Sequence, residues 1–215
     1  MVDANTYLNS NYPFPAVNRT LISSLDVSNK NLINTINLGP SENFTNLASL
    51  NASLNQISGF TLGELPKLQK IDFSHNIFTS FGIKNDGLLP SLAIVNFSHN
   101  FLTDVGPGSV ILLRLDVSSN ALTKLDLSAC KNLLTLNCSG NPDLSNLTLN
   151  SAFDPIDANA FDCRGTSIGK INTTSFIYDC QTGTRIKLHD TSATTSPAVV
   201  TVTNANQQIQ SNNNN

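Results

Sequence analysis

Charged residues are scarce in this chain: they make up 13% of its 215 residues, and the formal net charge at pH 7 is −3. This share is about half of the usual quarter, and serine, threonine and asparagine take the place of the missing charges. Lysine and arginine together number 12, against 15 acidic residues, so the chain lacks the basic surplus that marks nucleic-acid-binding domains. We therefore expect no nucleic-acid partner.

Long hydrophobic segments are absent as well. No apolar run approaches the roughly 20 residues that a membrane-spanning helix needs, so we expect no membrane span in this chain. The first residues, MVDANTYLNSNYPFPAVNRT, contain no apolar core of a signal peptide. The polar, charge-poor composition still favours an extracellular or cell-surface protein whose signal sequence is absent from this chain. A cytoplasmic location is the alternative.

The common patterns of catalytic and metal sites are also missing. The sequence contains no C-x-x-C pair of the kind that binds zinc and no glycine-rich phosphate loop. Ser74 and His75 are neighbours, but adjacent residues of a strand point to opposite faces and make a poor nucleophile–base pair. We expect no enzymatic activity, no metal and no cofactor.

One line recurs along the chain. It reads LISSLDVSNKNL, LASLNASLNQI, LQKIDFSHNIF, LAIVNFSHNFL, LLRLDVSSNAL and LLTLNCSGNPDL, and its shared template is L-x-x-L-x-L-x-x-N-x-L. This template resembles the leucine-rich repeat superfamily, and the resemblance covers roughly residues 20 to 186. The LDLS and LNFSHN wording is similar to the extracellular domains of receptor-like or secreted surface proteins, although no subfamily is assigned. The resemblance implies an α/β-type solenoid: a right-handed superhelix with a parallel sheet on its concave face and an irregular or short helical convex side.

The register of the repeats predicts the strands. If the Asn of the template is counted as position 9, positions 4 and 6 are apolar and face the same side of a strand. We expect one short strand per repeat, paired in parallel and in sequence order, so that stacking buries the apolar face. An incomplete eighth repeat is expected where Tyr178–Cys180 repeats Phe161–Cys163. The seven strands are centred on residues 25–27, 50–52, 71–73, 95–97, 115–117, 136–138 and 161–163.

Position 9 predicts a structural ladder of side chains. A buried carboxamide both donates and accepts, so it can satisfy backbone groups where the chain leaves each strand. Thr166 can do part of this, whereas Lys30 in the first repeat cannot. The ladder residues are Asn55, Asn76, Asn100, Asn120 and Asn141.

Composition divides the chain into three parts. Residues 1–21 form an N-terminal capping segment that covers the open edge of the sheet. Residues 22–190 form the solenoid, with about seven repeats plus a partial eighth. Residues 191–215 are rich in Ser, Thr, Asn and Gln and indicate a low-complexity tail or linker. The alternative is that residues 197–203 begin a further domain.

The chain has four cysteines. Cys138, Cys163 and Cys180 all occupy position 6, which points inward in consecutive repeats, and this favours buried free thiols. The even number is equally typical of two disulfides in a secreted protein. Cys130 lies outside the strand register, and its state and that of Cys180 stay open.

Seven Asn-x-Ser/Thr sequences are typical of a secreted glycoprotein. A chain this rich in Asn, Ser and Thr yields about as many by chance, and three of them follow from the repeat wording itself, so glycosylation stays open. The candidate asparagines are Asn18, Asn43, Asn51, Asn96, Asn137, Asn146 and Asn172.

The best candidate for a binding site is the concave face. Position 5 faces solvent there and holds Asp or Asn in every repeat, with basic residues two positions earlier and histidines at position 8. A rigid sheet pre-organises such side chains for a partner, although the same residues are common fillings of this repeat. The candidate ligand-binding residues are Lys70, Asp72, His75, Asn96, His99, Arg114 and Asp116.

These features together predict a non-enzymatic recognition module, a monomer that binds a protein, peptide or glycan on the concave face. The sequence has no tryptophan, and aromatic anchors usually dominate protein interfaces, so we expect a polar contact or one made through a rim. An intracellular leucine-rich repeat scaffold or regulatory protein is one alternative. A passive spacer of a surface protein is the other.

Overall fold

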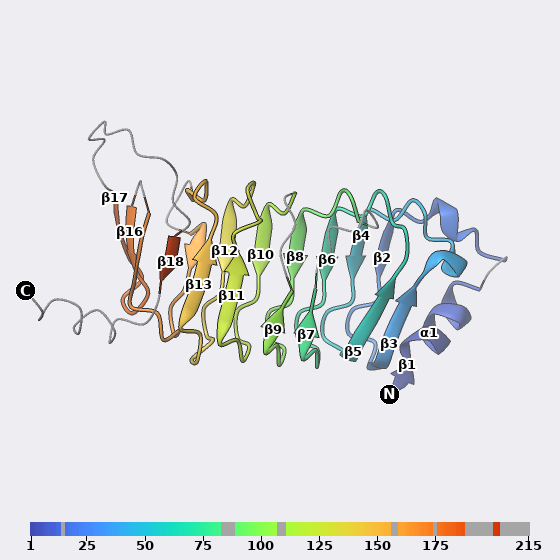
Figure 1. Ribbon diagram of the computed structural model, residues 1–215. Helices are drawn as coiled ribbons and strands as arrows, with labels where there is room; N and C mark the ends of the chain where they lie inside the picture. Colours follow the sequence, from blue (N-terminus) through green and yellow to red (C-terminus); the bar gives the residue numbers. More distant parts are fainter. Residues whose placement is uncertain are drawn as a thin grey trace, which may run out of the picture.

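The protein is an elongated stack of parallel strands (Figure 1). The computed structural model describes residues 1–13, 16–82, 89–106, 111–155, 159–173, 176–187 and 200–202. One strand from each repeat joins a seven-stranded sheet, in the order β14-β12-β10-β8-β6-β4-β2. The strands are β2 (Ser24–Asp26), β4 (Ser49–Asn51), β6 (Lys70–Asp72), β8 (Ile94–Asn96), β10 (Arg114–Asp116), β12 (Thr135–Asn137) and β14 (Phe161–Asp162).

Each strand of this sheet pairs in parallel with the strands of the preceding and following repeats. The predicted parallel pairing in sequence order is therefore confirmed, with most strands beginning about one residue earlier than expected. Position 4 of each repeat lies beside position 4 of the next, as Ile71 does beside Val95. Positions 4 and 6 are buried throughout the seven repeats, so stacking covers an apolar stripe that no single repeat can bury alone.

A second row of strands occupies the other side of the solenoid, where an irregular or short helical convex side was expected. The row consists of β3 (Leu32–Leu38), β5 (Gln56–Leu62), β7 (Ser80–Phe81), β9 (Asp104–Val105), β11 (Lys124–Leu127) and β13 (Asn146–Leu149). The predicted α/β character is thus a misjudgement, because the helices of the described residues all lie before residue 43. Residues 35–38 show one reason: the sequence TINL alternates polar and apolar side chains, which suits a strand with one buried face.

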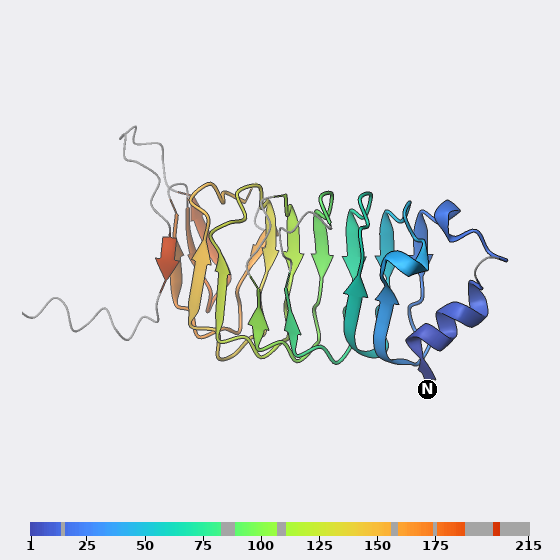
Figure 2. The ribbon, with the colours of Figure 1, turned by 45° about the vertical axis from the view of Figure 1, so that its right-hand side comes forward.

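Strands on both sides remove the usual cause of curvature. A helix is about 10 Å wide, whereas strands repeat every ~4.8 Å, so helices behind a sheet splay the turns and bend the stack. Here both sides are built from strands, and the stack looks nearly straight in two views (Figures 1 and 2). The candidate binding surface is therefore the outer face of the seven-stranded sheet, which is not concave.

The interior between the two rows is filled by leucine, isoleucine and phenylalanine. In the middle repeats the ring of Phe97 stacks on Phe81 at a centroid distance of 4.0 Å and meets Phe78 edge-on at 5.1 Å. Such aromatic pairs add to the stabilisation from area burial. They tie the two rows together at the centre of the array.

The first residues close one end of the stack. Strand β1 (Val2–Asp3) pairs with β3 and leads into helix α1 (Ala4–Asn11), which buries Ala4 and Leu8. The 3-10 turns η1 (Arg19–Leu21) and η2 (Pro40–Glu42) complete this end. Its centre is the buried side chain of Arg19.

Every polar group of the Arg19 guanidinium finds a partner. Nε donates to the carbonyl of Tyr12 at 2.7 Å, and one terminal nitrogen donates to Asn9 Oδ1 at 2.8 Å. The other forms an ion pair with Glu42, and the guanidinium lies over the ring of Phe44. Burial of a charge is tolerable when it is fully paired in this way, so Arg19 joins α1 to η2.

The other end closes with antiparallel strands. The segment that contains Tyr178 does not add an eighth parallel strand, because β16 (Phe176–Asp179) pairs antiparallel with β15 (Lys170–Asn172) and β17 (Thr184–Lys187). The short strand β18 (Val200–Val202) pairs antiparallel with β13. Other residues of the predicted 191–215 tail lie outside the described residues. The change of direction ends the parallel ladder on this side.

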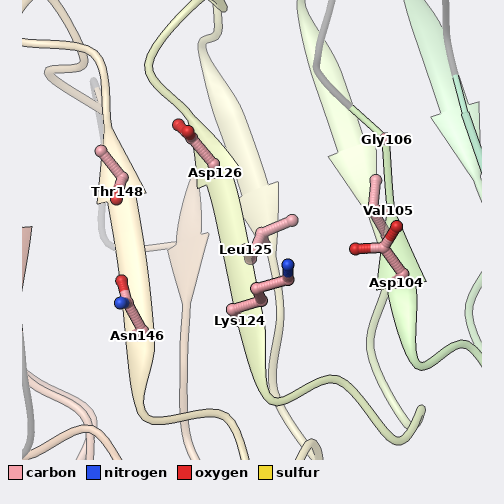
Figure 3. Close-up of a pocket in the computed structure, with 8 residues that line it drawn as sticks. All are labelled: Asp104, Val105, Gly106, Lys124, Leu125, Asp126, Asn146 and Thr148. Carbon is pink, nitrogen blue, oxygen red and sulfur yellow. The ribbon is translucent and has the colours of Figure 1, made fainter.

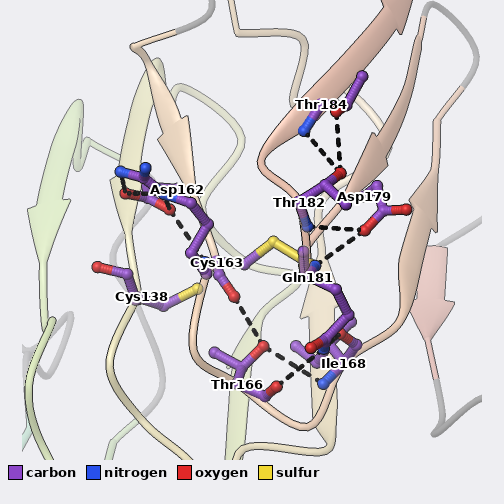
Figure 4. The surroundings of a disulfide bond; sticks show 12 residues. Cys138, Asp162, Cys163, Thr166, Ile168, Asp179, Gln181, Thr182 and Thr184 are labelled. Atoms are coloured by element: carbon purple, nitrogen blue, oxygen red, sulfur yellow. Dashed lines mark hydrogen bonds and ion pairs between the residues drawn. A yellow bond between two sulfur atoms is a disulfide. The ribbon is translucent and has the colours of Figure 1, made fainter.

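The cysteines differ in part from the prediction. Cys163 and Cys180 form a disulfide (Figure 4), with Cα atoms 5.0 Å apart, so the expected free thiol of Cys163 is wrong. Inward positions of successive turns place two side chains within bonding range, and the fold uses that proximity here. Cys138 is a buried free thiol, as expected, and burial raises the pKa of this thiol. Cys130 is also buried and forms no disulfide.

The asparagines of position 9 form a continuous hydrogen-bonded chain through the core. Asn100 is representative: its Oδ1 accepts from the N–H of Phe78, and its Nδ2 donates to the carbonyls of Phe73 and Phe97. Asn76 donates to the same carbonyl of Phe73, and Asn120 to that of Phe97. Neighbouring asparagines thus share one backbone carbonyl. The pattern holds from Asn55 to Asn141.

The substitution Asn100→Ala tests this chain. It leaves the buried N–H of Phe78 without an acceptor, so we expect the free energy of unfolding to fall by about 1–3 kcal/mol. The exposed Asn172 is the matched control, and Asn172→Ala is expected to change stability by less than about 0.5 kcal/mol. Urea denaturation measures both, and equal midpoints for the two variants would contradict the structural role of Asn100.

The cysteine pattern is tested by alkylation. In the native protein we expect no cysteine to react, since Cys130 and Cys138 are buried. After denaturation without reductant, two should react, and peptide mapping should recover Cys163 linked to Cys180. A bridge that includes Cys138 would overturn this assignment.

Candidate functional site

The candidate residues lie on and beside three neighbouring strands of the seven-stranded sheet. Lys70 and Asp72 belong to β6, Asn96 to β8, and Arg114 and Asp116 to β10. Residues 72, 96 and 116 are direct partners in the pairing register, as are residues 70, 94 and 114. The structure therefore brings these side chains together on one face of the sheet. Two histidines follow β6 and β8 at the adjoining turn.

Both histidines occupy a turn position that requires left-handed backbone. His75 and His99 each have a φ of 55°, and their rings stack with a centroid distance of 4.2 Å and an interplanar angle of 8°. Both side chains are exposed. Position 8 has a positive φ in every repeat, and glycine or a polar residue most easily adopts this conformation. The residues at this position are Asn29, Leu54, His75, His99, Ser119, Gly140 and Gly165.

The acidic residues of the face are engaged in the turns. Asp72 Oδ1 accepts from the backbone N–H of Ser74 at 3.0 Å and from its hydroxyl at 2.7 Å. Asp116 holds Ser118 in the same way, at 3.0 and 2.6 Å. These are local turns in which a side chain replaces a backbone acceptor. The carboxylates that the sequence suggested for ligand binding are thus already part of the turn.

Acid and amide alternate along this face. Position 5 carries Asp26, Asn51, Asp72, Asn96, Asp116, Asn137 and Asp162. The amide of Asn96 donates to the second oxygen of Asp72 at 3.2 Å, and Asn137 does the same to Asp116. The alternation keeps carboxylates two strand spacings apart, about 10 Å. It also gives each of these acids a donor from the next repeat.

Two carboxylates of the ladder have lowered pKa values. The backbone N–H of Ser28 is the main cause of the lowered pKa of Asp26. At Asp162 burial alone raises the pKa, but hydrogen bonds and charge from Arg164 outweigh it and hold that pKa below its ordinary value. Arg164 binds Asp162 through two nitrogens, the closer one at 2.7 Å. These ladder acids stay ionised at neutral pH.

The basic side chains of the face are free for a partner. Lys70 and Arg114 are both exposed, and neither side chain has a hydrogen bond or ion pair with any described residue. They flank the half-buried Ile94 in one row across β6, β8 and β10. The row puts two unpaired cations about 10 Å apart by strand spacing.

An apolar rim beside this face is missing from the sequence-based site. Phe101 is 60% exposed, Leu54 53% and Ile77 41%. Ile77 and Phe101 stand two residues after the stacked His75 and His99, on the same two adjacent repeats. Position 10 of the template tolerates any residue, and an apolar residue there was the available signal. This rim supplies the aromatic surface that the sheet face lacks.

The seven candidate glycosylation sites differ in accessibility. Asn18, Asn146 and Asn172 are exposed, whereas Asn43, Asn51, Asn96 and Asn137 are half-buried. The Oδ1 atoms of Asn51, Asn96 and Asn137 accept from the backbone two residues on. These three side chains serve the turns of the ladder.

The described residues also bear on metal sites and membrane spans. Within the described ranges, no group of three or more His, Cys, Asp or Glu side chains is placed to hold a metal ion. None of the helices in that part of the chain is long and apolar enough to cross a membrane.

Comparison with known proteins adds no relative. No protein-family model matches the sequence, and no curated protein matches it significantly. The resemblance to leucine-rich repeats therefore depends on the repeat template and on the stacked parallel strands.

The acid–amide alternation is tested by Asn96→Asp, which places a carboxylate between Asp72 and Asp116. Each like-charge pair about 5 Å apart repels by roughly 1 kcal/mol in water, so we expect a loss of about 1–2 kcal/mol of stability at pH 7. Salt screens this repulsion, because the Debye length falls from about 30 Å at 0.01 M to about 3 Å at 1 M ionic strength. Urea denaturation at low salt and in about 1 M NaCl, with Asn172→Asp as control, measures the effect. An equal loss at both salt concentrations would contradict the role of charge.

Proposed function

We propose that the protein is a non-enzymatic recognition module of the leucine-rich repeat type. Its partner lies against the outer face of the seven-stranded sheet, in the middle of the array. The observation that carries this proposal is the pair of exposed, unpaired cations, Lys70 and Arg114, on hydrogen-bonded strands. The strands already fix the backbone at both positions, so binding has to order only the two side chains, at about 0.5–1.5 kcal/mol each.

The chemistry of the face favours an anionic partner. Asp72 and Asp116 already accept hydrogen bonds from serine and asparagine, so their capacity for further donors is small. Lys70 and Arg114 offer donors without competition, and Arg114 can bind a carboxylate or sulfate through two nitrogens. The partner is therefore an acidic peptide, the acidic surface of a protein, or an anionic glycan.

The rim extends this contact beyond the charged row. The stacked rings of His75 and His99 and the exposed ring of Phe101 adjoin the turn that follows β6 and β8. Aromatic side chains contribute strongly to interfaces. A partner that covers both the sheet and its edge thus contacts the charged side chains of the sheet and the apolar side chains of the rim.

We place the protein outside the cell or on its surface. The disulfide between Cys163 and Cys180 supports an oxidising compartment, and exposed Asn18, Asn146 and Asn172 are suited to carry glycans. The buried thiol of Cys138, which forms no disulfide, is the observation that favours the intracellular scaffold instead. The self-contained acid–amide ladder favours the third reading, a passive spacer.

Paired substitutions test the binding face. Lys70→Ala combined with Arg114→Ala should leave the melting temperature within about 2 °C, since both side chains are exposed and unpaired. We expect it to weaken the binding of a deca-glutamate peptide or a heparin-derived hexasaccharide by about tenfold or more. Titration followed by 15N-NMR should place the shifts of the unmodified protein on β6, β8 and β10.

The matched control removes two other exposed cations, by Lys30→Ala with Lys131→Ala. This control removes the same amount of positive charge, and its two residues lie outside the row of Lys70, Ile94 and Arg114. Equal losses in the two double variants would reduce the effect to overall charge and contradict the site. A protein that binds neither probe would favour the spacer.

A further inference from the structure

The second row of strands is interrupted opposite the middle of the seven-stranded sheet. Strand β9 pairs with β7, and β11 pairs with β13, but no sheet contains both β9 and β11. The repeats remain hydrogen-bonded just before this point, where the N–H of Ala121 donates to the carbonyl of Leu102. The two strands separate only beyond it, so a cleft opens between them.

Glycine explains why β9 lies toward β7. The N–H of Gly106 donates to the carbonyl of Phe81 at 2.6 Å. A Cβ on Gly106 would come within 2.9 Å of the Cα of Gly82, so only glycine permits this approach. The end of β9 is thereby drawn to one neighbour and leaves its other edge open.

The cleft has the size and lining of a ligand site. Its volume is about 410 Å³, within the range of about 300–1,000 Å³ of small-molecule pockets. Asp104 and Lys124 face each other across it, the half-buried Val105 supplies apolar surface, and the buried Leu125 forms its floor (Figure 3). Both polar and apolar groups therefore border one space.

Most polar side chains of the cleft have no hydrogen-bond partner among the described residues. Lys124 lies beside Asn146, and Asp126 beside Thr148, in the register of β11 and β13. Asp126 accepts one hydrogen bond, from the backbone of Ser128. With the described residues, the side chains of Asp104, Lys124, Asn146 and Thr148 make no hydrogen bond or ion pair. Donors and acceptors thus alternate over a small area without partners.

We propose that this cleft is a second binding site, which takes a saccharide unit. Hydroxyl groups both donate and accept, so vicinal hydroxyls match a surface on which carboxylate, ammonium, amide and hydroxyl groups stand side by side. The half-buried side chain of Val105 and the methylene groups of Lys124 suit the C–H face of a sugar ring. The site is separate from the cationic face of the other sheet and does not depend on it.

An inserted peptide strand fits the cleft less well. Cα atoms of β9 and β11 come within 8 Å of one another. A strand between them needs two strand spacings, about 10 Å, so it would have to force the repeats apart. A compact polar ligand needs no such movement.

The test uses protein from a bacterial host, so that Asn146 carries no glycan. The 15N-labelled chain is titrated with maltose, cellobiose, lactose and N,N′-diacetylchitobiose, and separately with spermidine. We expect at least one disaccharide to shift amides of β9, β11 and β13, with a dissociation constant in the millimolar range. Lys124→Gln and Asn146→Ala should each weaken that binding about five- to tenfold, the effect of one lost hydrogen bond.

Two controls match these variants. Lys131→Gln removes another exposed lysine, and Asn172→Ala removes another exposed asparagine of an Asn-x-Thr sequence; both should keep the full affinity. The proposal is overturned if no disaccharide shifts these amides, or if all four variants bind alike. Shifts caused by spermidine alone would also overturn it, because they would show a cation site formed by Asp104 and Asp126.

Discussion

The fold depends on one repeated hydrogen-bonded unit, an asparagine amide shared between backbone carbonyls of successive repeats. The chain Asn55, Asn76, Asn100, Asn120 and Asn141 runs through the interior, and each carbonyl between two of them accepts from both. Every repeat must turn inward after its strand. This turn buries polar backbone groups that cannot reach water. The shared carbonyls link each repeat to its neighbours alone, so stability accumulates by nearest-neighbour contacts. In the first repeat Lys30 breaks the pattern, and Asn55 of the second accepts from its backbone.

The same turn explains why each repeat carries Asp or Asn at position 5 and, in most repeats, Ser at position 7. Position 5 accepts from position 7, position 7 in six repeats is serine, and position 8 must adopt a left-handed conformation. Such residues bond locally to the backbone. Polar side chains that look like a binding surface in the sequence, Asp72 and Asp116 among them, therefore serve the fold first. Lys70 and Arg114 stand outside this hydrogen-bonded set.

The sequence predicted what its template repeats, and it failed where the template ends. The strand of each repeat, its parallel order and its inward positions all follow from apolar residues at fixed spacing. The second row of strands has no such template, because its strands range from two to seven residues in length, although the alternation of polar and apolar residues in TINL, residues 35–38, was a readable signal. The bond between Cys163 and Cys180 depends on how the last turn closes, which is a tertiary event. The cleft depends on the approach of Gly106 to Gly82, and spacing alone does not reveal that contact.

The two ends close by different means, and the difference favours the middle of the array for binding. At the first end, a paired Arg19 and helix α1 cover the sheet; at the other, antiparallel strands and a disulfide stop the parallel ladder. Repeats between them have neighbours on both sides and phenylalanine rings that join the two rows, so they open least readily. The cationic row lies on these repeats, and the cleft lies on the opposite row at β9, β11 and β13. Because both rest on backbone that stacking already fixes, a ligand on either has little ordering entropy to overcome.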